Sequence, residues 1–238
     1  DYNAKDQTYT LKEGIPYMSG TFNRSDIRPG MWKFDDRNGD KVIDDSDMSV
    51  IGNANPDFYG GLNNQFKYKG WDFNFFFTFS YGGEVLNATK LTNTKTATTN
   101  YSVLNIADSS NRWMTVNSEG QLITDPEEMA AINAGRTVAC IYDMEAGDKY
   151  IHSWAVEDAS YLRLKNATVS YTFDLRKKTR LLRDITLAVT GENLWLWTKY
   201  NGFDPDVSSE GTSSTLRRVD MGAYPRSRMF VFSIQLRY

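Results

Sequence analysis

The sequence predicts an all-β fold, and more specifically part of an antiparallel transmembrane β-barrel. Two segments, 57–80 and 228–238, alternate apolar and polar side chains, as strands do when one face meets lipid and the other meets water. A third observation is the aromatic content of 14%. This share is high for a soluble domain and typical of barrels in which Tyr and Trp form girdles at both membrane interfaces.

Segment 228–238 shows the clearest alternation. On one side of an extended strand lie five apolar residues, and polar residues predominate among those between them. A strand of this kind that runs to an aromatic residue is typical of outer-membrane barrels. The apolar side consists of Phe230, Phe232, Ile234, Leu236 and Tyr238.

Segment 57–80 predicts a β-hairpin with a two-residue turn at Lys69-Gly70. The second strand places five aromatic residues on one face, which is more than a half-buried strand of a soluble sandwich usually carries. Phe76 breaks the alternation, and we expect it to face the lumen. The aromatic face consists of Trp71, Phe73, Phe75, Phe77 and Phe79.

The remaining elements predict how the connections are sorted. Strands are expected at 161–173 and 185–197, a further strand near Tyr9 to Glu13, and a short helix at 125–134 with Pro126 in its first turn. Long connections then alternate with short ones at 69–70 and 174–184. Because outer-membrane barrels have short periplasmic turns and long extracellular loops, we expect Tyr238 in the periplasm. The expected extracellular loops are 15–57, 82–157 and 198–225.

About six strands cannot enclose a useful lumen, and an open sheet in lipid would leave edge N–H and C=O groups unpaired. The chain is therefore expected to be the C-terminal part of a longer barrel. It starts at Asp1 without a signal peptide, which an exported protein needs.

The bulk composition excludes several classes of protein. A net charge of −3 and a pI near 5.3 give no reason to expect a nucleic-acid partner. A mean hydropathy of −0.53 with 24% charged residues excludes a helical membrane bundle. The only cysteine, Cys140, and the only histidine, His152, lack a catalytic pattern around them, so we expect no enzymatic activity.

Residues 36–47 resemble a calcium-binding loop in the spacing of their oxygen ligands. Lys41 replaces the glycine expected at the sixth position, and Asp rather than Glu stands at the twelfth; both changes weaken the predicted affinity for Ca²⁺. The alternative is an acidic surface turn that caps its own backbone. The expected ligands are Asp36, Asn38, Asp40, Asp44, Asp47 and the carbonyl of Val42.

Several motifs, in this order, resemble the C-terminal portion of SusC/RagA-type TonB-dependent transporters. The resemblance covers nearly all of 28–80 and 154–238, whereas 1–27 and 82–150 match poorly. The motifs are Pro29-Gly-Met-Trp-Lys-Phe-Asp-Asp-Arg-Asn-Gly-Asp40, Ile51-Gly-Asn-Ala-Asn-Pro-Asp-Phe58, Val156-Glu-Asp-Ala-Ser-Tyr-Leu-Arg-Leu-Lys-Asn166, Gly191-Glu-Asn-Leu194, Thr198-Lys-Tyr-Asn-Gly-Phe-Asp-Pro-Asp206 and Gly222-Ala-Tyr-Pro-Arg-Ser-Arg228.

The resemblance implies a barrel of about 22 strands in the outer membrane, plugged by an N-terminal domain that this chain lacks. It also implies import of glycans or peptides, a SusD-like surface lipoprotein as a lid, and energy from TonB through the plug. This chain would supply the last strands, several outer loops and part of the lid-binding rim.

Aromatic residues in the long loops are the candidate substrate contacts, because aromatic rings stack on sugar faces and also pack against peptides. The alternative is that they are girdle or loop-core residues. A rival function is a secreted carbohydrate-binding β-sandwich with a calcium-stabilised loop, which would be soluble without detergent. The candidates are Trp113, Tyr150, Trp154 and Tyr200.

Overall fold

A computed structural model describes residues 1–3, 5–6, 8–94, 103–141, 151–177, 181–207, 209 and 217–238. The chain divides into two compact units, each of which is described by itself. The loop unit comprises residues 1–51 and 88–155, and the sheet unit comprises 52–87 and 156–238.

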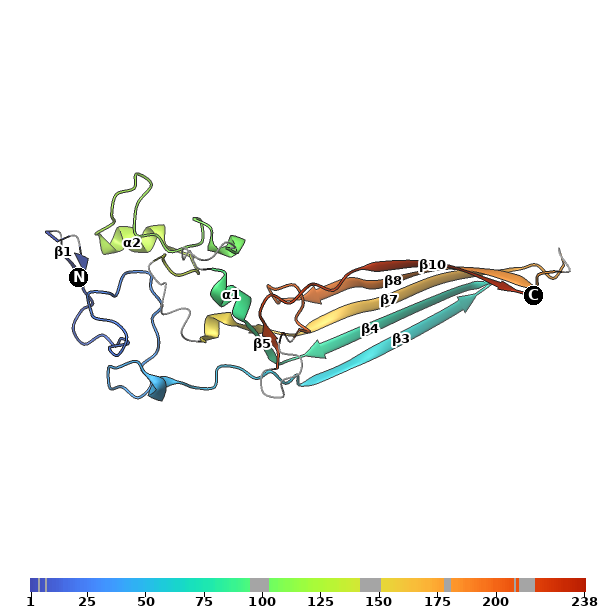
Figure 1. The fold of residues 1–238 in the computed structure, drawn as a ribbon, viewed down its shortest axis with the longest axis horizontal. Coiled ribbons are helices and arrows are strands. Elements are labelled where there is room, and N and C mark those ends of the chain that lie inside the picture. Colours follow the sequence, from blue (N-terminus) through green and yellow to red (C-terminus); the bar gives the residue numbers. More distant parts are fainter. Residues whose placement is uncertain are drawn as a thin grey trace. The chain divides into compact units, whose positions relative to one another are not determined.

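The sheet unit is built on one five-stranded sheet in which every neighbouring pair is antiparallel (Figure 1). The predicted all-β antiparallel class is confirmed, as are the hairpin at 57–80 and the three later strands. The sheet has five long strands rather than about six, because the segment near Tyr9 forms only a two-residue strand. In order across the sheet the strands are β10 (Met229–Arg237), β8 (Asp184–Thr198), β7 (Tyr161–Asp174), β4 (Trp71–Tyr81) and β3 (Phe58–Tyr68).

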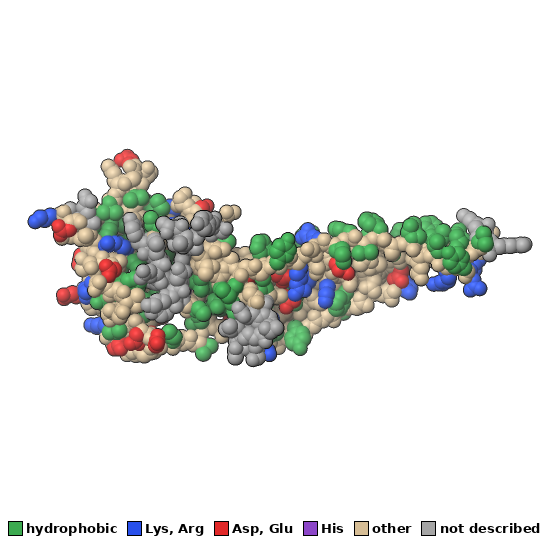
Figure 2. Space-filling view, viewed as in Figure 1, with side chains coloured by type: hydrophobic (Ala, Val, Ile, Leu, Met, Phe, Trp, Pro, Cys, Tyr) green, Lys and Arg blue, Asp and Glu red, His purple; other side chains and the backbone are tan. Residues whose placement is uncertain are grey.

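Directly opposed residues place apolar side chains on one face of this sheet. Trp71 lies opposite Tyr68 on one side and Tyr171 on the other, and this row continues through Leu187 to Ile234. Neighbouring rows also carry apolar side chains, for example the row from Phe66 through Phe73, Val169 and Val189 to Phe232, because side chains on paired strands point to the same face. This apolar face is exposed, with hydrophobic side chains at the surface of the sheet in Figure 2. Its exposed members include Phe66, Trp195, Phe230, Phe232 and Ile234.

The opposite face of the sheet is polar. The hydroxyl oxygens of Thr168 and Thr190 lie 2.8 Å apart, and Gln65 Nε2 donates to the carboxylate of Asp72 at 2.9 Å. Phe76 belongs to this face, as the break in the alternation predicts. The two faces therefore differ in chemistry along the length of the sheet.

A β-bulge at Lys165 explains why the apolar side of β7 changes from even to odd residue numbers. Leu164 pairs with Phe77, whereas Asn166 pairs with Phe76 on the opposite face. Lys165 is the extra residue that shifts the pleat by one position. Both parts of β7 thus keep their apolar side chains on the same face of the sheet.

Both short connections lie at one end of the sheet, which we call the turn end. Lys69 and Gly70 have φ values of 46° and 90°, as a two-residue hairpin turn requires. Asp174 pairs with Asp184, which in turn pairs with Arg237, so the β7–β8 connection and the end of β10 lie at this end too. The long connections leave from the other end, which we call the loop end.

A smaller sheet, which the sequence did not predict, follows the long strands at the loop end. In it β5 (Glu84–Asn87) pairs antiparallel with β6 (Val156–Asp158) and parallel with β9 (Val219–Asp220). The buried side chains of Val85, Ala159 and Tyr200 form a small hydrophobic cluster here.

The loop unit consists mostly of irregular segments with short elements. The predicted helix is present as α2 (Pro126–Ile132), whose first turn is capped by the side chain of Asp125 accepting the N–H of Glu127. No helix in the described part of the chain is long and apolar enough to cross a membrane. The other elements are β1 (Tyr2–Asn3), β2 (Thr8–Tyr9), η1 (Asp45–Asp47), α1 (Ala88–Thr92), η2 (Asn105–Ala107) and η3 (Ser153–Ala155).

Candidate functional site

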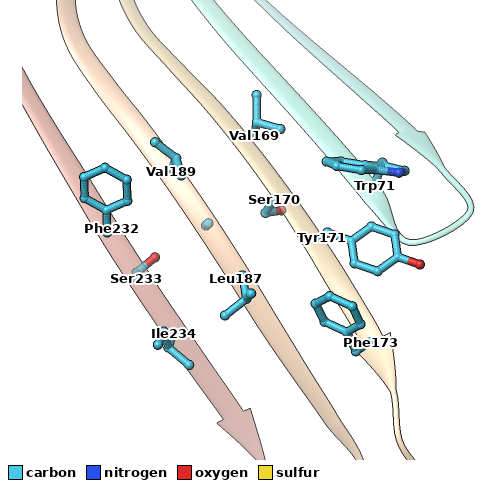
Figure 3. A pocket seen from close by; sticks show the side chains of 11 residues that line it. Trp71, Val169, Ser170, Tyr171, Phe173, Leu187, Val189, Phe232, Ser233 and Ile234 are labelled. Carbon is cyan, nitrogen blue, oxygen red and sulfur yellow. The ribbon is translucent and has the colours of Figure 1, made fainter.

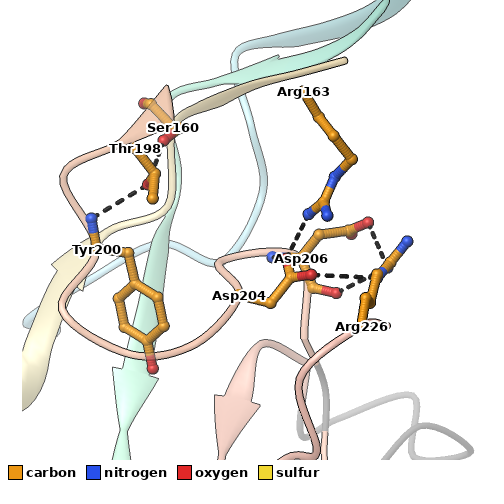
Figure 4. Close-up of polar contacts among 7 residues, drawn as sticks. All are labelled: Ser160, Arg163, Thr198, Tyr200, Asp204, Asp206 and Arg226. Carbon is orange, nitrogen blue, oxygen red and sulfur yellow. Dashed lines mark hydrogen bonds and ion pairs between the residues drawn. The ribbon is translucent and has the colours of Figure 1, made fainter. Parts of the chain in front are cut away.

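A buried ion-pair network holds the connection after β8 against the loop end of β7 (Figure 4). Arg163 Nη2 donates to Asp204 Oδ1 at 2.6 Å, and the two side chains are only 5% and 9% exposed. The other oxygen, Asp204 Oδ2, lies 3.1 Å from Arg226 Nε. Arg226 also donates to Asp206 Oδ2 at 2.8 Å. Both oxygens of the buried carboxylate are therefore paired with a cation.

The network joins three of the sequence segments that carry the family resemblance. Arg163 comes from motif 156–166, Asp204 from motif 198–206, and Arg226 from motif 222–228. Sequence reasoning did not identify these residues as a site. The one sequence signal that could have pointed to this network is that charged residues recur inside those motifs. Which of these charged residues pair with one another depends on strand register.

Tyr200, a predicted substrate contact, lies inside the loop end of the sheet unit. It is 6% exposed, and its hydroxyl donates to Asp220 Oδ2 at 2.6 Å. Burial, reinforced by this hydrogen bond, raises the pKa of the Tyr200 hydroxyl. Thr198 Oγ1 accepts the N–H of Tyr200 and donates to the carbonyl of Ser160 (Figure 4). The ring thus acts as a packing residue in this conformation, and contact with substrate stays a prediction.

Trp154 lies in an aromatic cluster of the loop unit. The ring centroids of Trp154 and Trp32 are 5.1 Å apart, and that of His152 lies 4.6 Å from Trp32. Lys90 Nζ lies 4.2 Å from the centroid of the Trp154 ring and donates to the Trp154 carbonyl at 2.8 Å. A cation over an indole face stabilises the ring's orientation. Trp154 is half-buried, so part of its ring surface is accessible.

Trp113 packs closely on the backbone of Gly30 in the loop unit. A Cβ atom added to Gly30 would lie 2.2 Å from Trp113 Cδ1, and Gly30 has a φ of 86°. The Trp113 ring is therefore engaged in packing within the loop unit. The fourth candidate, Tyr150, lies outside the described residues. Trp113 and Trp154 belong to the loop unit and Tyr200 belongs to the sheet unit.

In the Asp-rich loop, the carboxylates accept hydrogen bonds from backbone N–H groups. The two oxygens of Asp36 accept from Gly39 and Lys41, and those of Asp47 accept from residues that include Arg37 and Asp44. The hydrogen bonds from these backbone groups lower the pKa of Asp47, that from Asp44 most strongly. This arrangement is the self-capped turn considered as the alternative to a metal site.

The donor types in this loop fit Ca²⁺, but their arrangement does not gather around one point. Within the described residues, no group of three or more His, Cys, Asp or Glu side chains is placed to hold a metal ion. Asn38 Oδ1 and Asp40 Oδ1 accept backbone N–H groups, and Asp44 Oδ1 accepts from Ser46. Val42 takes part in a β-bridge with Tyr17. In this conformation the carboxylates are held by backbone N–H groups, and binding of Ca²⁺ stays a prediction.

The sheet itself defines the class of protein. Its apolar face is exposed, its other face is polar, and within the described residues β3 and β10 each pair on one side only. A soluble domain leaves neither a surface this apolar nor two open edges of this length. These features are typical of a section of a transmembrane β-barrel wall.

Comparison with known proteins agrees with this class. No family model matches the chain. A TonB-dependent receptor P3 of Formosa agariphila is 32% identical over 244 residues, which cover 100% of this chain and 21% of the receptor. The TonB-dependent receptor SusC of Bacteroides thetaiotaomicron is 27% identical over 207 residues, which cover 86% of this chain and 17% of SusC.

Solved structures show the same fold. The RagAB peptide importer in its closed-closed state superposes with a TM-score of 0.58 and 20% identity, covering 96% of this chain and 22% of that one. A second structure, of the RagAB peptide transporter, gives a TM-score of 0.57 and 20% identity over 77% of this chain and 17% of that one.

These matches confirm the predicted resemblance to SusC/RagA-type TonB-dependent transporters. The chain spans about a fifth of the length of the curated relatives that it matches. The relatives are receptors and transporters, which are not enzymes, so the prediction that the chain is not an enzyme is confirmed as well.

Proposed function

We propose that this chain forms part of the wall and outer loops of a TonB-dependent nutrient importer in the outer membrane. The observation that carries the proposal is the exposed apolar face of the five-stranded sheet, backed by a polar face on the same strands. In a barrel wall the apolar face contacts lipid and the polar face lines the lumen. The open edges at β3 and β10 would pair with the other strands of the barrel.

The sorting of connections supports one orientation in the membrane. Short turns of such barrels are periplasmic, so the turn end of the sheet would face the periplasm, together with the end of β10. The loop end would face outward. The loop unit, which consists of parts of the long connections, would then be extracellular.

Site-directed spin labelling of the full-length protein in lipid bilayers tests the orientation of the two faces. Phe232→Cys and Ser233→Cys, in a background without other reactive thiols, form a matched pair. Both positions are exposed in the structure, but consecutive residues of β10 point to opposite faces. We expect the label at 232 to be accessible to oxygen dissolved in lipid, and the label at 233 to a water-soluble nickel complex. If both labels met only the aqueous reagent, the chain would not be a barrel wall.

The same pair separates the barrel from the rival β-sandwich. A sandwich would cover the apolar face with a second sheet, and a label at 232 would then be shielded from both reagents. The exposure of 77% for Phe232 supports the barrel.

We also propose that the whole transporter imports glycans or peptides together with a SusD-like surface lipoprotein, and that TonB supplies energy through the plug domain. The names of the relatives support this proposal, since one is SusC and the solved structures are of a RagAB peptide importer. Affinity purification of the full-length protein from its native outer membrane should retain a surface lipoprotein. Uptake of a panel of oligosaccharides and peptides, with and without TonB, would identify the substrate class; TonB-independent uptake would overturn the mechanism.

Among the predicted substrate contacts, Trp154 is the one that the structure supports best. Its ring is half-buried and oriented by Lys90, whereas Tyr200 is buried and Trp113 packs on Gly30. An aromatic contact contributes about 0.5–1.5 kcal/mol, so Trp154→Ala should weaken substrate binding by about two- to tenfold. Trp154→Phe keeps a ring and should restore most of it. Unchanged affinity in Trp154→Ala, measured by calorimetry, would remove the assignment.

A structural Ca²⁺ in loop 36–47 is a separate and narrower proposal. It is supported by the spacing of the oxygen donors and by the φ of 68° at Lys41, where calcium loops place a glycine for a sharp turn. Binding would require carboxylates to turn from backbone N–H groups toward the ion. Calorimetric titration of the full-length protein with Ca²⁺ should give saturable heat that Asp40→Asn reduces; its absence in the unmodified protein would exclude the ion.

A further inference from the structure

An apolar groove runs across the exposed face of the sheet near the turn end (Figure 3). Its floor includes Val169 and Val189. Trp71 and Tyr171 form one wall, with ring centroids 4.9 Å apart, and Phe232 stands on the other side. The groove measures about 790 Å³, which lies within the roughly 300–1,000 Å³ of ligand-binding sites. Aliphatic floor and aromatic walls suit a flexible hydrocarbon chain.

The turn end of the sheet carries more cations than carboxylates. Within segments 67–72, 174–177, 181–184 and 235–238, six Lys or Arg residues stand against three Asp residues. Each of the three carboxylates is paired: Asp72 with Lys67 at 3.3 Å, Asp174 with Arg176 at 2.6 Å, and Asp184 with Arg237 at 3.4 Å. Lys69, Lys177 and Arg183 supply the excess positive charge. Figure 2 shows basic and hydrophobic side chains together at this end.

Of these three excess cations, Arg183 and Lys69 lie closer to the groove along the chain than Lys177 does. Arg183 precedes Ile185 by two residues, and Ile185 lies opposite Phe173 at the groove. Arg183 lies just before the first residue of β8, Asp184, and it is exposed at this end of the sheet. Its N–H donates to the Arg237 carbonyl at 2.8 Å, which fixes this position. Lys69 precedes Trp71 in the hairpin turn.

We propose that the groove binds an acyl chain of an anionic phospholipid whose phosphate is held by Lys69 and Arg183. The inference rests on the proposed function, which places this face in lipid and the turn end at the periplasmic headgroup level. Charge complementarity favours this occupant, because a planar guanidinium forms paired hydrogen bonds with phosphate and a nearby ammonium adds a second positive charge. A neutral apolar partner would use the groove but would leave the cations without a counter-charge.

Native mass spectrometry of the full-length protein in detergent tests the proposal. Phosphatidylglycerol and phosphatidylcholine with identical acyl chains are added in equal amounts. We expect the protein to retain phosphatidylglycerol preferentially. Because each surface cation contributes about 1 kcal/mol to binding of anionic lipid, Lys69→Gln and Arg183→Gln should each lower the preference by about fivefold.

Arg237→Gln is the matched control. Arg237 lies at the same end of the sheet, but its position in β10 belongs to the polar face and it pairs with Asp184. It should leave the lipid preference unchanged. A loss in Arg237→Gln as large as in Arg183→Gln would show attraction to net charge alone and would overturn the site.

A groove-filling substitution, Val189→Trp, tests the acyl-chain part of the proposal separately. We expect it to reduce retention of both lipids, because the added indole occupies the floor. Unchanged retention in Val189→Trp, or co-purification of a protein in place of lipid on this face, would overturn the proposal. If the label at 232 reaches lipid and no phosphatidylglycerol preference is found, only this inference fails. If that label does not reach lipid, the proposed function fails with it.

Discussion

The Arg163–Asp204 ion pair makes a sharp prediction about the loop end of the sheet. Asp204→Ala removes the carboxylate and leaves the Arg163 guanidinium, which is 5% exposed, without its partner at 2.6 Å. Removing one member of a buried pair costs about 3–5 kcal/mol, because the other charge stays desolvated. Arg226 also loses a contact, but its side chain is 42% exposed, so solvent screening keeps that part small.

Hydrogen exchange of the full-length protein in detergent or bilayers measures this effect locally. The network anchors residues 203–206, so their amides should exchange faster by roughly two to three and a half orders of magnitude in Asp204→Ala. The strands away from the network should keep their protection. Local exchange is the suitable readout because a large membrane barrel need not unfold in one two-state step.

Two further variants separate the buried pair from its exposed partner. Arg226→Gln leaves the buried pair in place and should cost only about 0.2–1 kcal/mol, or less than about sixfold in exchange rate. Replacing both buried charges, in Arg163→Met with Asp204→Leu, should restore most of the protection because no uncompensated charge remains. If Asp204→Ala and Arg226→Gln had equal small effects, the assignment of a buried anchor would be refuted.

Further predictions concern three single positions. Tyr200→Phe removes a hydrogen bond to the buried carboxylate of Asp220, so it should loosen residues 219–223 by about 1–3 kcal/mol in hydrogen exchange. Unchanged protection would contradict the proposed packing role. Folding raises the pKa of the Tyr200 hydroxyl, so the neutral hydroxyl should stabilise the folded state fully below about pH 10. This stabilisation should be lost as the pH rises above about 10 and the hydroxyl ionises. In a pH series of exchange rates, Tyr200→Phe should lack this alkaline transition. Lys41→Gly should stabilise loop 36–47 by up to about 1 kcal/mol, because the left-handed φ of 68° suits glycine. Resistance of the loop to proteolysis measures this effect, and faster cleavage of the variant would contradict the prediction. Gly30→Ala should destabilise the loop unit by more than about 1 kcal/mol, because the new Cβ would lie 2.2 Å from the Trp113 ring and the φ of Gly30 is positive. We expect a shift in tryptophan fluorescence and faster proteolysis. Neither change should occur if Gly30 and Trp113 are not in contact.

Local patterns in the sequence were sufficient to predict the strands, one turn and one helix. The five aromatics of β4 and the apolar row of β10 follow from the period-two geometry of any extended chain, which depends only on adjacent residues. The Lys69-Gly70 turn and the Asp125 cap of α2 are equally local, since each involves residues one to three positions apart.

The site depended on contacts between distant residues, and these only the tertiary structure decided. Arg163 and Asp204 are 41 residues apart, and their pairing requires β7 and the connection after β8 to be correctly aligned. The bulge at Lys165 and the parallel pairing of β5 with β9 also arise from strand register. Alternation specifies which face of a strand is apolar, but it does not specify which charged side chains meet at the strand's end. For that reason the strands and the apolar face of the sheet could be predicted from the sequence, and the ion pair that anchors the connection after β8 could not.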